Sequence, residues 1–386
     1  MPSPSATPRV LHVDDQHTWR GGEQQMLYLA RGLAERGIET ALVVQPQSPA
    51  EEKAREAGLR VYPVRMRGEA DLLAALAIAR AARAGGYNIL HAHTAHAQAL
   101  ILMARHVGRA PCKLVAHRRI EFPVGRGLLG LGRLKYHLGV DAYIAVSNRV
   151  KQTLLRAGVP EWRVFPVHTV TAPERFTGAT PNPALRAELG IPEGAFVVGN
   201  IAALVAHKDH RTLLDACRLV RDQVPETWVV IVGDGPLKAE ILAQAAALHM
   251  ADRLVMTGFR WDVPQLIRAF DAFALSSTEE GLSGTLLEVA ASGCPIVTTD
   301  AGGAREAVLD GQSGIVVPVR DPGALAAGLL RLHAEPALAR AFAARGLERV
   351  VTHFNPRVLT ERTLDVYQRV LAGQVGPDHP VGYCED

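Results

Sequence analysis

Two carboxylates separated by a short glycine-containing segment carry the clearest chemistry in this chain. Glu280 and Glu288 lie eight residues apart, with Ser283, Gly284 and Thr285 between them, where a buried strand gives way to a helix. The first N–H groups of a helix have no partners inside it, and the helix dipole adds positive charge, so a phosphate can bind there. The carboxylates would repel that phosphate unless they bind neutral hydroxyls of the same ligand. A nucleotide sugar presents both groups; the alternative is a polar loop whose acid only complements the dipole.

Strands and helices alternate along the chain, and they set where these residues lie. We expect strands at residues 10–13, 40–44, 59–64, 88–91, 113–116, 142–146, 164–167, 196–201, 228–232, 254–257, 272–275, 296–298 and 315–317. Helices are expected at 23–36, 51–57, 71–84, 149–157 and 355–371, and between the later strands. This alternation is typical of parallel sheets covered on both faces. The expected fold class is α/β, with two doubly wound Rossmann-like domains facing a central cleft and ligands at the carboxyl ends of the strands.

A proline-rich stretch divides the two alternating halves. Residues 171–192 contain four prolines and interrupt the pattern, as an interdomain connection does. We therefore expect an N-terminal domain at residues 9–175 and a C-terminal domain at 190–354. The helix at 355–372 is expected to pack back toward the N-terminal domain, and residues 373–386 to form a loose tail.

The composition excludes several classes of protein. The chain has 386 residues, 48% of them hydrophobic, which suits about two globular domains and does not suit a disordered or collagen-like chain. A net charge of +3 is too small to indicate a nucleic-acid partner. The four cysteines are far apart, so neither a metal cluster nor a disulfide framework is expected. With no apolar leader and no apolar run of about 18 residues, the sequence predicts a cytoplasmic location.

Several further motifs occur in a fixed order around the paired carboxylates. They are Gly21-Gly22-Glu23, His91-Ala92-His93, Ala145-Val146-Ser147, Gly-Asp-Gly-Pro at 233–236, Thr257-Gly258-Phe259-Arg260, Ala301-Gly302-Gly303-Ala304-Arg305-Glu306 and Asp310-Gly311-Gln312-Ser313-Gly314. Together with the E-x7-E segment, this order resembles the retaining family 4 glycosyltransferases of the GT-B fold. The resemblance spans roughly residues 9–372.

The resemblance implies an activity and a set of site residues. It implies retaining, metal-independent transfer from a nucleotide-diphosphate sugar, without a cofactor, to a saccharide or lipid-linked saccharide in cell-envelope glycan synthesis. Glu280 would contact donor-sugar hydroxyls and Glu288 the ribose. The remaining implied donor contacts are Lys208 and the backbone of Ser283, Gly284 and Thr285 for the diphosphate, and Gly258, Phe259 and Arg260 for the base. Gly21, Gly22 and Glu23 would form the acceptor-side loop.

Histidines at strand ends have both functional and structural interpretations. His117 resembles the family histidine beside the donor sugar, and with Lys208 and Glu280 it forms the implied catalytic set. In retaining transfer the acceptor hydroxyl attacks on the leaving-group face, so His117 would orient the sugar or shield positive charge; the alternative is a core or capping histidine. His91 and His93 form an H-x-H pair, but zinc needs a third ligand. We interpret them as polar contacts.

The sequence departs from the family pattern at two places. Ala203 stands where the family usually has an arginine five residues before the lysine, so one cation is missing from the diphosphate site. Arg118 and Arg119 are candidates to replace it from the opposite domain, as is His207; the alternative is a surface basic patch. Residues 168–171 replace the usual Asn-Gly-Val-Asp, which affects only the expected hinge contacts.

Basic charge is concentrated between residues 105 and 156. This region has eleven lysines and arginines against two acidic residues, and it contains the apolar stretch 127–132. Such a combination suits peripheral contact with an anionic membrane, here the inner face, but also an anionic polymer or simple solubility.

Two other functions remain open at this stage. A GT-B-fold nucleotide-sugar epimerase would need its own acid–base pair around one nucleotide sugar. Ala203 suggests the second, a non-catalytic scaffold that binds a nucleotide sugar, because a cation of the diphosphate site is missing there.

Overall fold

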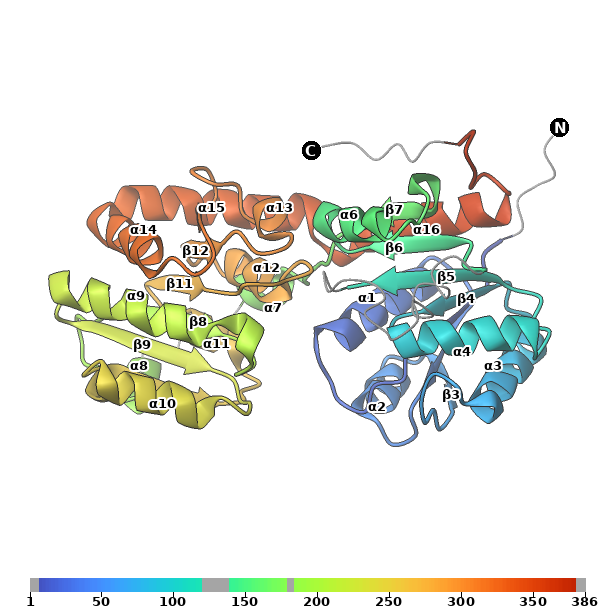
Figure 1. The fold of residues 1–386 in the computed structure, drawn as a ribbon, viewed down its shortest axis with the longest axis horizontal. Helices are drawn as coiled ribbons and strands as arrows, with labels where there is room; N and C mark the ends of the chain where they lie inside the picture. Colours follow the sequence, from blue (N-terminus) through green and yellow to red (C-terminus); the bar gives the residue numbers. More distant parts are fainter. Residues whose placement is uncertain (1–6, 120–138, 179–183, 380–386) are drawn as a thin grey trace. The chain divides into compact units, whose positions relative to one another are not determined.

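A computed structural model of the chain describes residues 7–119, 139–178 and 184–379 (Figure 1). It divides into two compact units. Unit 1 consists of Met1–Thr169 and Pro356–Asp386, and unit 2 of Val170–Asn355. Residues 170–175, which the sequence analysis assigned to the N-terminal domain, cluster with unit 2, where Thr171 N donates to Phe354 O (2.9 Å).

Unit 1 is built on a seven-stranded parallel sheet. The strands are β1 (Val10–Val13), β2 (Thr40–Val44), β3 (Arg60–Pro63), β4 (Ile89–Ala92), β5 (Lys113–Arg118), β6 (Ala142–Ala145) and β7 (Val164–Pro166). The order is β3-β2-β1-β4-β5-β6-β7, so the winding reverses between β1 and β4. At such a switch point the helices leave in opposite directions and open a site beyond the strand ends.

Helices cover both faces of this sheet. They are α1 (Gly21–Glu35), α2 (Pro49–Glu56), α3 (Leu72–Ala84), α4 (Ala95–His106), α6 (Asn148–Arg156) and α16 (Pro356–Leu371). Leu42 and Val44 pack with residues of α1 and α2, whereas Ala41 and Val43 pack with residues of α3 and α4. Consecutive residues of β2 are therefore buried on opposite faces, which explains its unbroken apolar sequence.

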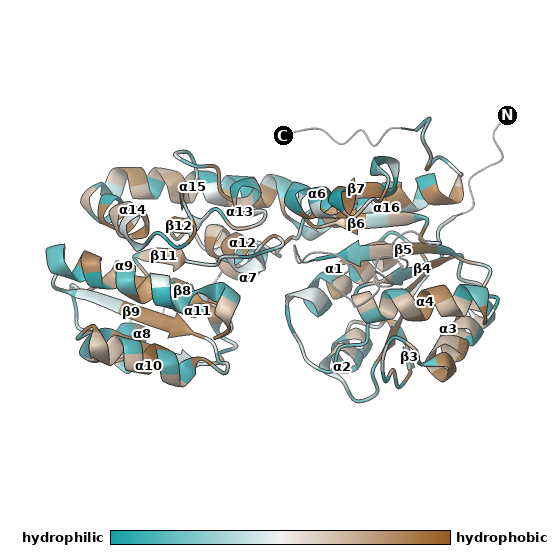
Figure 2. Cartoon of the chain, in the orientation of Figure 1, coloured by the Kyte–Doolittle hydropathy of each residue, from teal (hydrophilic) through white to brown (hydrophobic). Residues whose placement is uncertain are grey.

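Unit 2 repeats the same winding with six parallel strands. They are β8 (Phe196–Ile201), β9 (Thr227–Val232), β10 (Leu254–Gly258), β11 (Ala272–Leu275), β12 (Ile296–Thr299) and β13 (Ile315–Val317), in the order β10-β9-β8-β11-β12-β13. The switch point lies between β8 and β11. The helices are α7 (Glu174–Thr177), α8 (Leu185–Glu188), α9 (His210–Gln223), α10 (Lys238–Ala247), α11 (Val263–Ile267), α12 (Gly284–Ala291), α13 (Ala304–Ala307), α14 (Pro322–Ala334) and α15 (Pro336–His353). Figure 2 shows hydrophobic colour along much of β9, and mixed colours along α9 and α10.

Helix α16 returns from the end of unit 2 to join unit 1. It packs along α1, and the contact is so close that a Cβ on Gly32 would lie 2.1 Å from Thr360 Oγ1. Tyr367 is fully buried and its hydroxyl lies 2.6 Å from His91 Nδ1. The C-terminal helix therefore contributes directly to the strand-end region of unit 1.

The two doubly wound α/β sheets expected from the sequence are confirmed. Helix α4 of unit 1 was not foreseen, because its alanine-rich sequence has little contrast between its faces and follows β4 after only two residues. The short helices α7 and α8 were not foreseen either, since they lie in the proline-rich stretch that was expected to be a connection. Strand β5 also continues through Arg118 instead of ending at Ala116. Within the described residues, no helix is both long and apolar enough to cross a membrane.

Candidate active site

The loops that follow β8, β9 and β10 in unit 2 are joined backbone to backbone. Gly233 N donates to Gly258 O (2.9 Å), and Leu204 N donates to Asp234 O (3.0 Å). A Cβ on Gly233 would lie 2.0 Å from Ala202 O, and Gly233 has a φ of +144°. Glycine is required there by both the backbone conformation and the close approach. The segments at the ends of these three strands are thus connected by hydrogen bonds beside the switch point.

Lys208 and Glu280 meet across that switch point, although 72 residues separate them in the chain. Lys208 Nζ pairs with Glu280 Oε1, which also accepts from Ser277 Oγ (2.8 Å). Both side chains are mostly buried. Ser276 Oγ donates to Lys208 O (3.0 Å) and Thr278 N to His207 O (2.8 Å), so hydrogen bonds between the two loops set this geometry. The sequence predicted both residues, and the structure brings them together.

Gly302 holds the backbone of Glu280 in place from the next loop. It has a φ of +56°, and a Cβ there would lie 2.0 Å from Glu280 O. Gly303 N donates to Gly281 O (2.8 Å). The Ala301–Glu306 motif therefore supports the carboxylate loop through a contact that only glycine allows.

Helix α12 begins where the sequence predicts an anion site. Ser283 is its N-cap residue, and the serine side chain makes no capping hydrogen bond to the described residues. The N–H groups of the first turn, which includes Gly284 and Thr285, therefore lack a side-chain cap. Glu288 lies one turn further, and no described residue donates a hydrogen bond to its carboxylate. Burial raises the pKa of Glu288 to about 7, and the charge of Arg175 partly opposes this shift.

The end of β10 exposes two aromatic rings. Phe259 and Trp261 are 60% and 69% exposed, and their ring centroids lie 4.8 Å apart in an edge-to-face arrangement. Arg260 is paired with Asp262 through Nε–Oδ1 (2.7 Å) and Nη2–Oδ2 (2.5 Å) contacts. Gly258 adopts a φ of +70° at the turn. Gly258, Phe259 and Arg260 were predicted from the sequence and Trp261 was not, although two aromatic residues close together after a strand are a pattern that the sequence shows.

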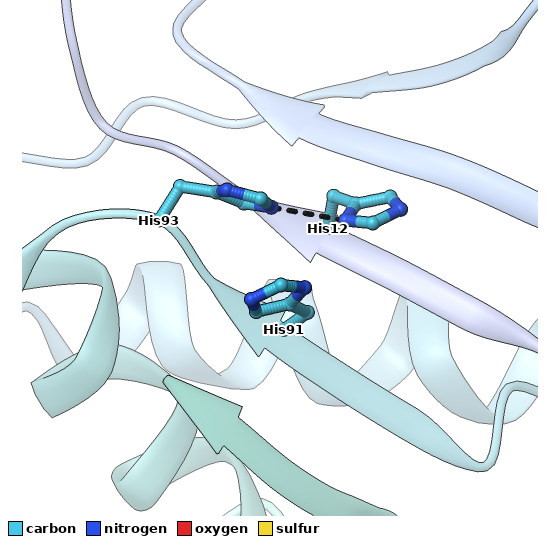
Figure 3. A group of neighbouring side chains, drawn as sticks. All are labelled: His12, His91 and His93. Atoms are coloured by element: carbon cyan, nitrogen blue, oxygen red, sulfur yellow. Dashed lines mark hydrogen bonds between the residues drawn. The ribbon is translucent and has the colours of Figure 1, made fainter. Parts of the chain in front are cut away.

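A cluster of buried histidines occupies the switch point of unit 1. Figure 3 shows His12 of β1 facing His91 and His93 at the end of β4, and their ligand-type nitrogen atoms all lie within 4.8 Å of one another. His117 of β5 stacks on His91, with ring centroids 5.5 Å apart and planes inclined by 4°. Burial lowers the pKa of His12 to about 3, and holds the pKa values of His91, His93 and His117 well below the usual value. All four rings are therefore neutral near pH 7.

The third histidine supplies the ligand that the H-x-H pair lacked, so the cluster must be tested as a metal site. Arg119 Nη2 lies 3.0 Å from His93 Nδ1, and an arginine can only donate, so Nδ1 is the acceptor. The proton of His93 is then on Nε2, where it is donated to His12 Nδ1 (3.0 Å). A metal on His93 Nε2 would require a proton on Nδ1, facing the guanidinium, whereas metal-bound histidines normally face an acceptor. The donor set favours hydrogen-bonded neutral histidines over a metal.

The remaining predicted residues of unit 1 lie around this cluster. The sequence predicted an acceptor-side loop at Gly21, Gly22 and Glu23. In the structure these residues form the first turn of α1 instead. The reason is that Glu23 Oε2 accepts from Arg20 N (2.6 Å) and so caps the helix. Arg119 lies against Gly22, where a Cβ would be 3.6 Å from its Cδ. Arg118 is the last residue of β5, in register with Ala145, and not part of the following loop.

Sequence reasoning missed several residues of the two sites. In unit 1 these are His12, Asp14 and Tyr367, and in unit 2 Ser277 and Arg175. Asp14 and His12 could have been found as polar residues in and directly after the first strand of a doubly wound sheet. Tyr367 could not, because nothing in its local sequence tells where α16 packs.

Comparisons with known proteins cover both units. Residues 181–349 match the family model described as glycosyl transferases group 1, and residues 19–175 match glycosyltransferase family 4. The chain is 25% identical over 361 residues to a lipopolysaccharide core biosynthesis glycosyltransferase, LpsE, of Rhizobium meliloti, covering 92% of this chain and 96% of the relative. A second such protein of that organism, LpsD, is 28% identical over 62% of this chain and 67% of its own length.

Solved structures have the same fold. Alr3699/HepE of Anabaena, in a complex with UDP-glucose, has a TM-score of 0.81 at 20% identity, covering 93% of this chain and 98% of that one. A glycosyltransferase of Rickettsia africae has a TM-score of 0.83 at 17% identity, covering 95% and 99%. At these identities the likeness speaks for the fold.

Proposed function

From the premise that this chain belongs to family 4 of the glycosyltransferases, with the GT-B fold, we propose that it is a retaining, metal-independent enzyme. It is a glycosyltransferase of the kind found in lipopolysaccharide and polysaccharide synthesis. Its donor is a nucleotide-diphosphate sugar and its acceptor a saccharide or glycolipid. The observation that carries this proposal is the Lys208–Glu280 pair at the switch point of unit 2, next to the N-terminus of α12.

The donor site exchanges internal contacts for contacts with its ligand. Without a ligand, Lys208 is neutralised by Glu280. A diphosphate held by the N–H groups of residues 283–285 draws the ammonium of Lys208 toward itself, because two negative phosphates outweigh one carboxylate. Glu280 is then free to accept hydrogen bonds from donor-sugar hydroxyls. Glu288, which lacks a donor among the described residues, accepts from the ribose, while Gly258, Phe259 and Arg260 line the base.

The reaction needs no nucleophile from the protein. The acceptor hydroxyl attacks the anomeric carbon on the leaving-group face as the bond to the phosphate oxygen breaks, and that oxygen takes the hydroxyl proton. Lys208 and the helix N-terminus stabilise the negative charge that develops on the diphosphate. His117 is neutral, because burial lowers its pKa. It therefore serves as a hydrogen-bonding group that orients the sugar and not as a cation.

The place of action follows from the same premise. Relatives named for lipopolysaccharide core synthesis support a cell-envelope acceptor. We propose a cytoplasmic enzyme in peripheral contact with the inner face of the membrane through its basic region between residues 105 and 156. Part of that region, including Arg126, Arg133 and Lys135, lies outside the described residues.

A nucleotide-sugar screen with the full-length protein tests this function. UDP-glucose, UDP-N-acetylglucosamine, GDP-mannose and dTDP-glucose are compared by thermal shift, where a ligand at 100 times its Kd adds about 2.7 kcal/mol. The best donor is then followed for nucleotide release and for the anomeric configuration of the product by NMR, with and without EDTA. An inverted product contradicts the retaining mechanism, and loss of activity in EDTA contradicts metal independence. Binding without turnover favours the scaffold, and an isomerised nucleotide sugar favours the epimerase.

A further inference from the structure

Asp14 lies directly after β1, at the point where the winding of unit 1 reverses. Its Oδ1 accepts from Gln16 N (2.9 Å), and its backbone N donates to Val43 O (3.0 Å). The side chain is 1% exposed, and its Oδ2 has no hydrogen-bond partner within residues 7–119, 139–178 and 184–379. A buried carboxylate oxygen without a donor destabilises a fold. A ligand that brings a donor removes that penalty.

The charged groups near Asp14 do not provide the missing donor. Glu23 of α1 is an acceptor whose Oε2 is already bound to Arg20 N, and the neighbouring Asp15 is an acceptor too. Arg119 is close enough for its charge to act on Asp14, but its Nη2 is directed at His93 Nδ1. Among the described residues, Arg119 Nε is likewise buried without a partner. Asp14 Oδ2 is therefore an acceptor without a donor, and Arg119 Nε is a donor without an acceptor, among the described residues.

A hydroxyl group matches this pair, because it donates one hydrogen bond and accepts another. Resting on the glycosyl transfer proposed above, we propose that Asp14 binds a hydroxyl of the saccharide acceptor, which donates to Oδ2 and accepts from Arg119. Asp14 is then a specificity-determining residue for the acceptor, and no bond forms or breaks at it. Burial and the charge of Glu23 raise the pKa of Asp14 to about 7, as expected of a carboxylate poorly compensated without its ligand.

Asp15 is a matched control from the next position in the chain. Its Oδ1 accepts from Thr94 Oγ1 (2.5 Å), and its Oδ2 lies 3.0 Å from His96 Nδ1. Both oxygens of this carboxylate already have partners inside unit 1. Substituting Asp15 therefore removes a negative charge next to Asp14 but leaves the unpartnered Oδ2 of Asp14 in place.

The test compares wild type, Asp14→Asn, Asp14→Ala and Asp15→Asn in full-length protein. UDP release from UDP-glucose is measured while methyl α-D-glucopyranoside, methyl α-D-mannopyranoside or glycerol is titrated as the acceptor. Both Asp14 variants should raise the half-saturating acceptor concentration about ten-fold or more, and by far more than the KM for UDP-glucose. Asp15→Asn should not show this split. An unchanged acceptor dependence in folded Asp14 variants, or an equal rise in the donor KM, overturns the proposal.

A stability measurement tests, independently of turnover, whether Asp14 Oδ2 lacks a partner in the folded protein. Because the pKa of the folded wild-type carboxyl is raised, wild type loses stability as the pH rises from the ordinary carboxyl value to about 7, and the whole loss is present at pH 8. Asp14→Asn should therefore melt at an equal or higher temperature than wild type at pH 8, and any gain should be smaller at pH 5. A lower melting temperature at both pH values would mean that Oδ2 has a structural partner, and the proposal would be wrong. Wild type that turns over no nucleotide sugar contradicts the proposed function, and the melting comparison still tests Asp14.

Discussion

At the scale of single residues, the two sites share a feature that the sequence does not display. Asp14 in unit 1 is a buried carboxyl whose Oδ2 lacks a donor among the described residues, and Glu288 in unit 2 is a half-buried carboxyl to which no described residue donates a hydrogen bond. In each case burial is the largest cause of the raised pKa. Protein interiors rarely leave such groups uncompensated without a functional reason.

Glu288→Gln should weaken nucleotide binding and leave the fold intact. Loss of a charge-assisted hydrogen bond to the ribose costs about 1.5–3 kcal/mol, or about ten-fold or more in Kd. Calorimetric titration of the free nucleotide measures this, and unchanged affinity would exclude the ribose role.

The same variant has an expected sign in stability. The folded-state pKa of Glu288, about 7, lies above its ordinary value, so wild type loses stability as the pH rises from the ordinary value through 7. Glutamine cannot ionise. Ligand-free Glu288→Gln should therefore melt above wild type at pH 8 and close to it at pH 4.5, which a thermal-melt series over pH checks.

At the scale of elements, the geometry of the donor site depends on glycines that let loops approach one another. Gly302→Ala would place a Cβ against Glu280 O at a backbone conformation already unfavourable for alanine. We expect a loss of about 1–3 kcal/mol in unfolding free energy and at least about a ten-fold fall in kcat, because the Glu280 loop must move.

Gly311→Ala is the control for that prediction. Gly311 also has a positive φ, +69°, but nothing lies within 4 Å of a Cβ placed there. It should show only the backbone strain, of about 1 kcal/mol, and keep its kcat. Denaturant unfolding and steady-state kinetics on both variants separate the two effects, and equal kcat in the two would contradict the role of the close approach.

At the scale of the whole molecule, Ala203 stands where the resemblance implies a cation, and we predict that catalysis needs a cation from unit 1 instead. We predict that Arg118 or Arg119 reaches the diphosphate when the enzyme closes. For Arg119 this means leaving His93 Nδ1. Arg118→Ala or Arg119→Ala should lower kcat by about 100-fold or more, with less effect on binding of the free nucleotide. Full kcat in both single variants and in the double variant would end this idea.

Membrane contact is the second prediction at this scale. If the basic region docks on anionic lipid, co-sedimentation should require phosphatidylglycerol in phosphatidylcholine vesicles and weaken with salt. Changing Arg126, Arg133 and Lys135 to Glu should release the protein. Changing the exposed Arg211, Arg340 and Arg345 of unit 2 to Glu is the charge-matched control and should not. Equal binding to neutral vesicles would reject the electrostatic account.

Features that depend on short segments could be predicted from the amino-acid sequence. Strand and helix periodicity predicted two doubly wound sheets, because burial on both faces leaves an unbroken apolar run within a single strand. The E-x7-E segment was readable because its loop, helix start and second carboxylate follow one another within nine residues. Helix α4 was not predicted because its alanines give little contrast in hydrophobicity between its faces.

Contacts between residues that are distant in the chain could not be predicted in this way, because they depend on how the sheets assemble. His12 and His93 are 81 residues apart and Lys208 and Glu280 are 72 apart, yet each pair lies at a switch point where strands distant in the chain become neighbours. Parallel strands pair through crossovers, so adjacency follows from the order of the strands in the sheet and not from spacing in the chain. The charge states of Asp14 and Glu288 were hidden for the same reason, since a pKa is set by burial and by neighbours that only the folded sheets bring together.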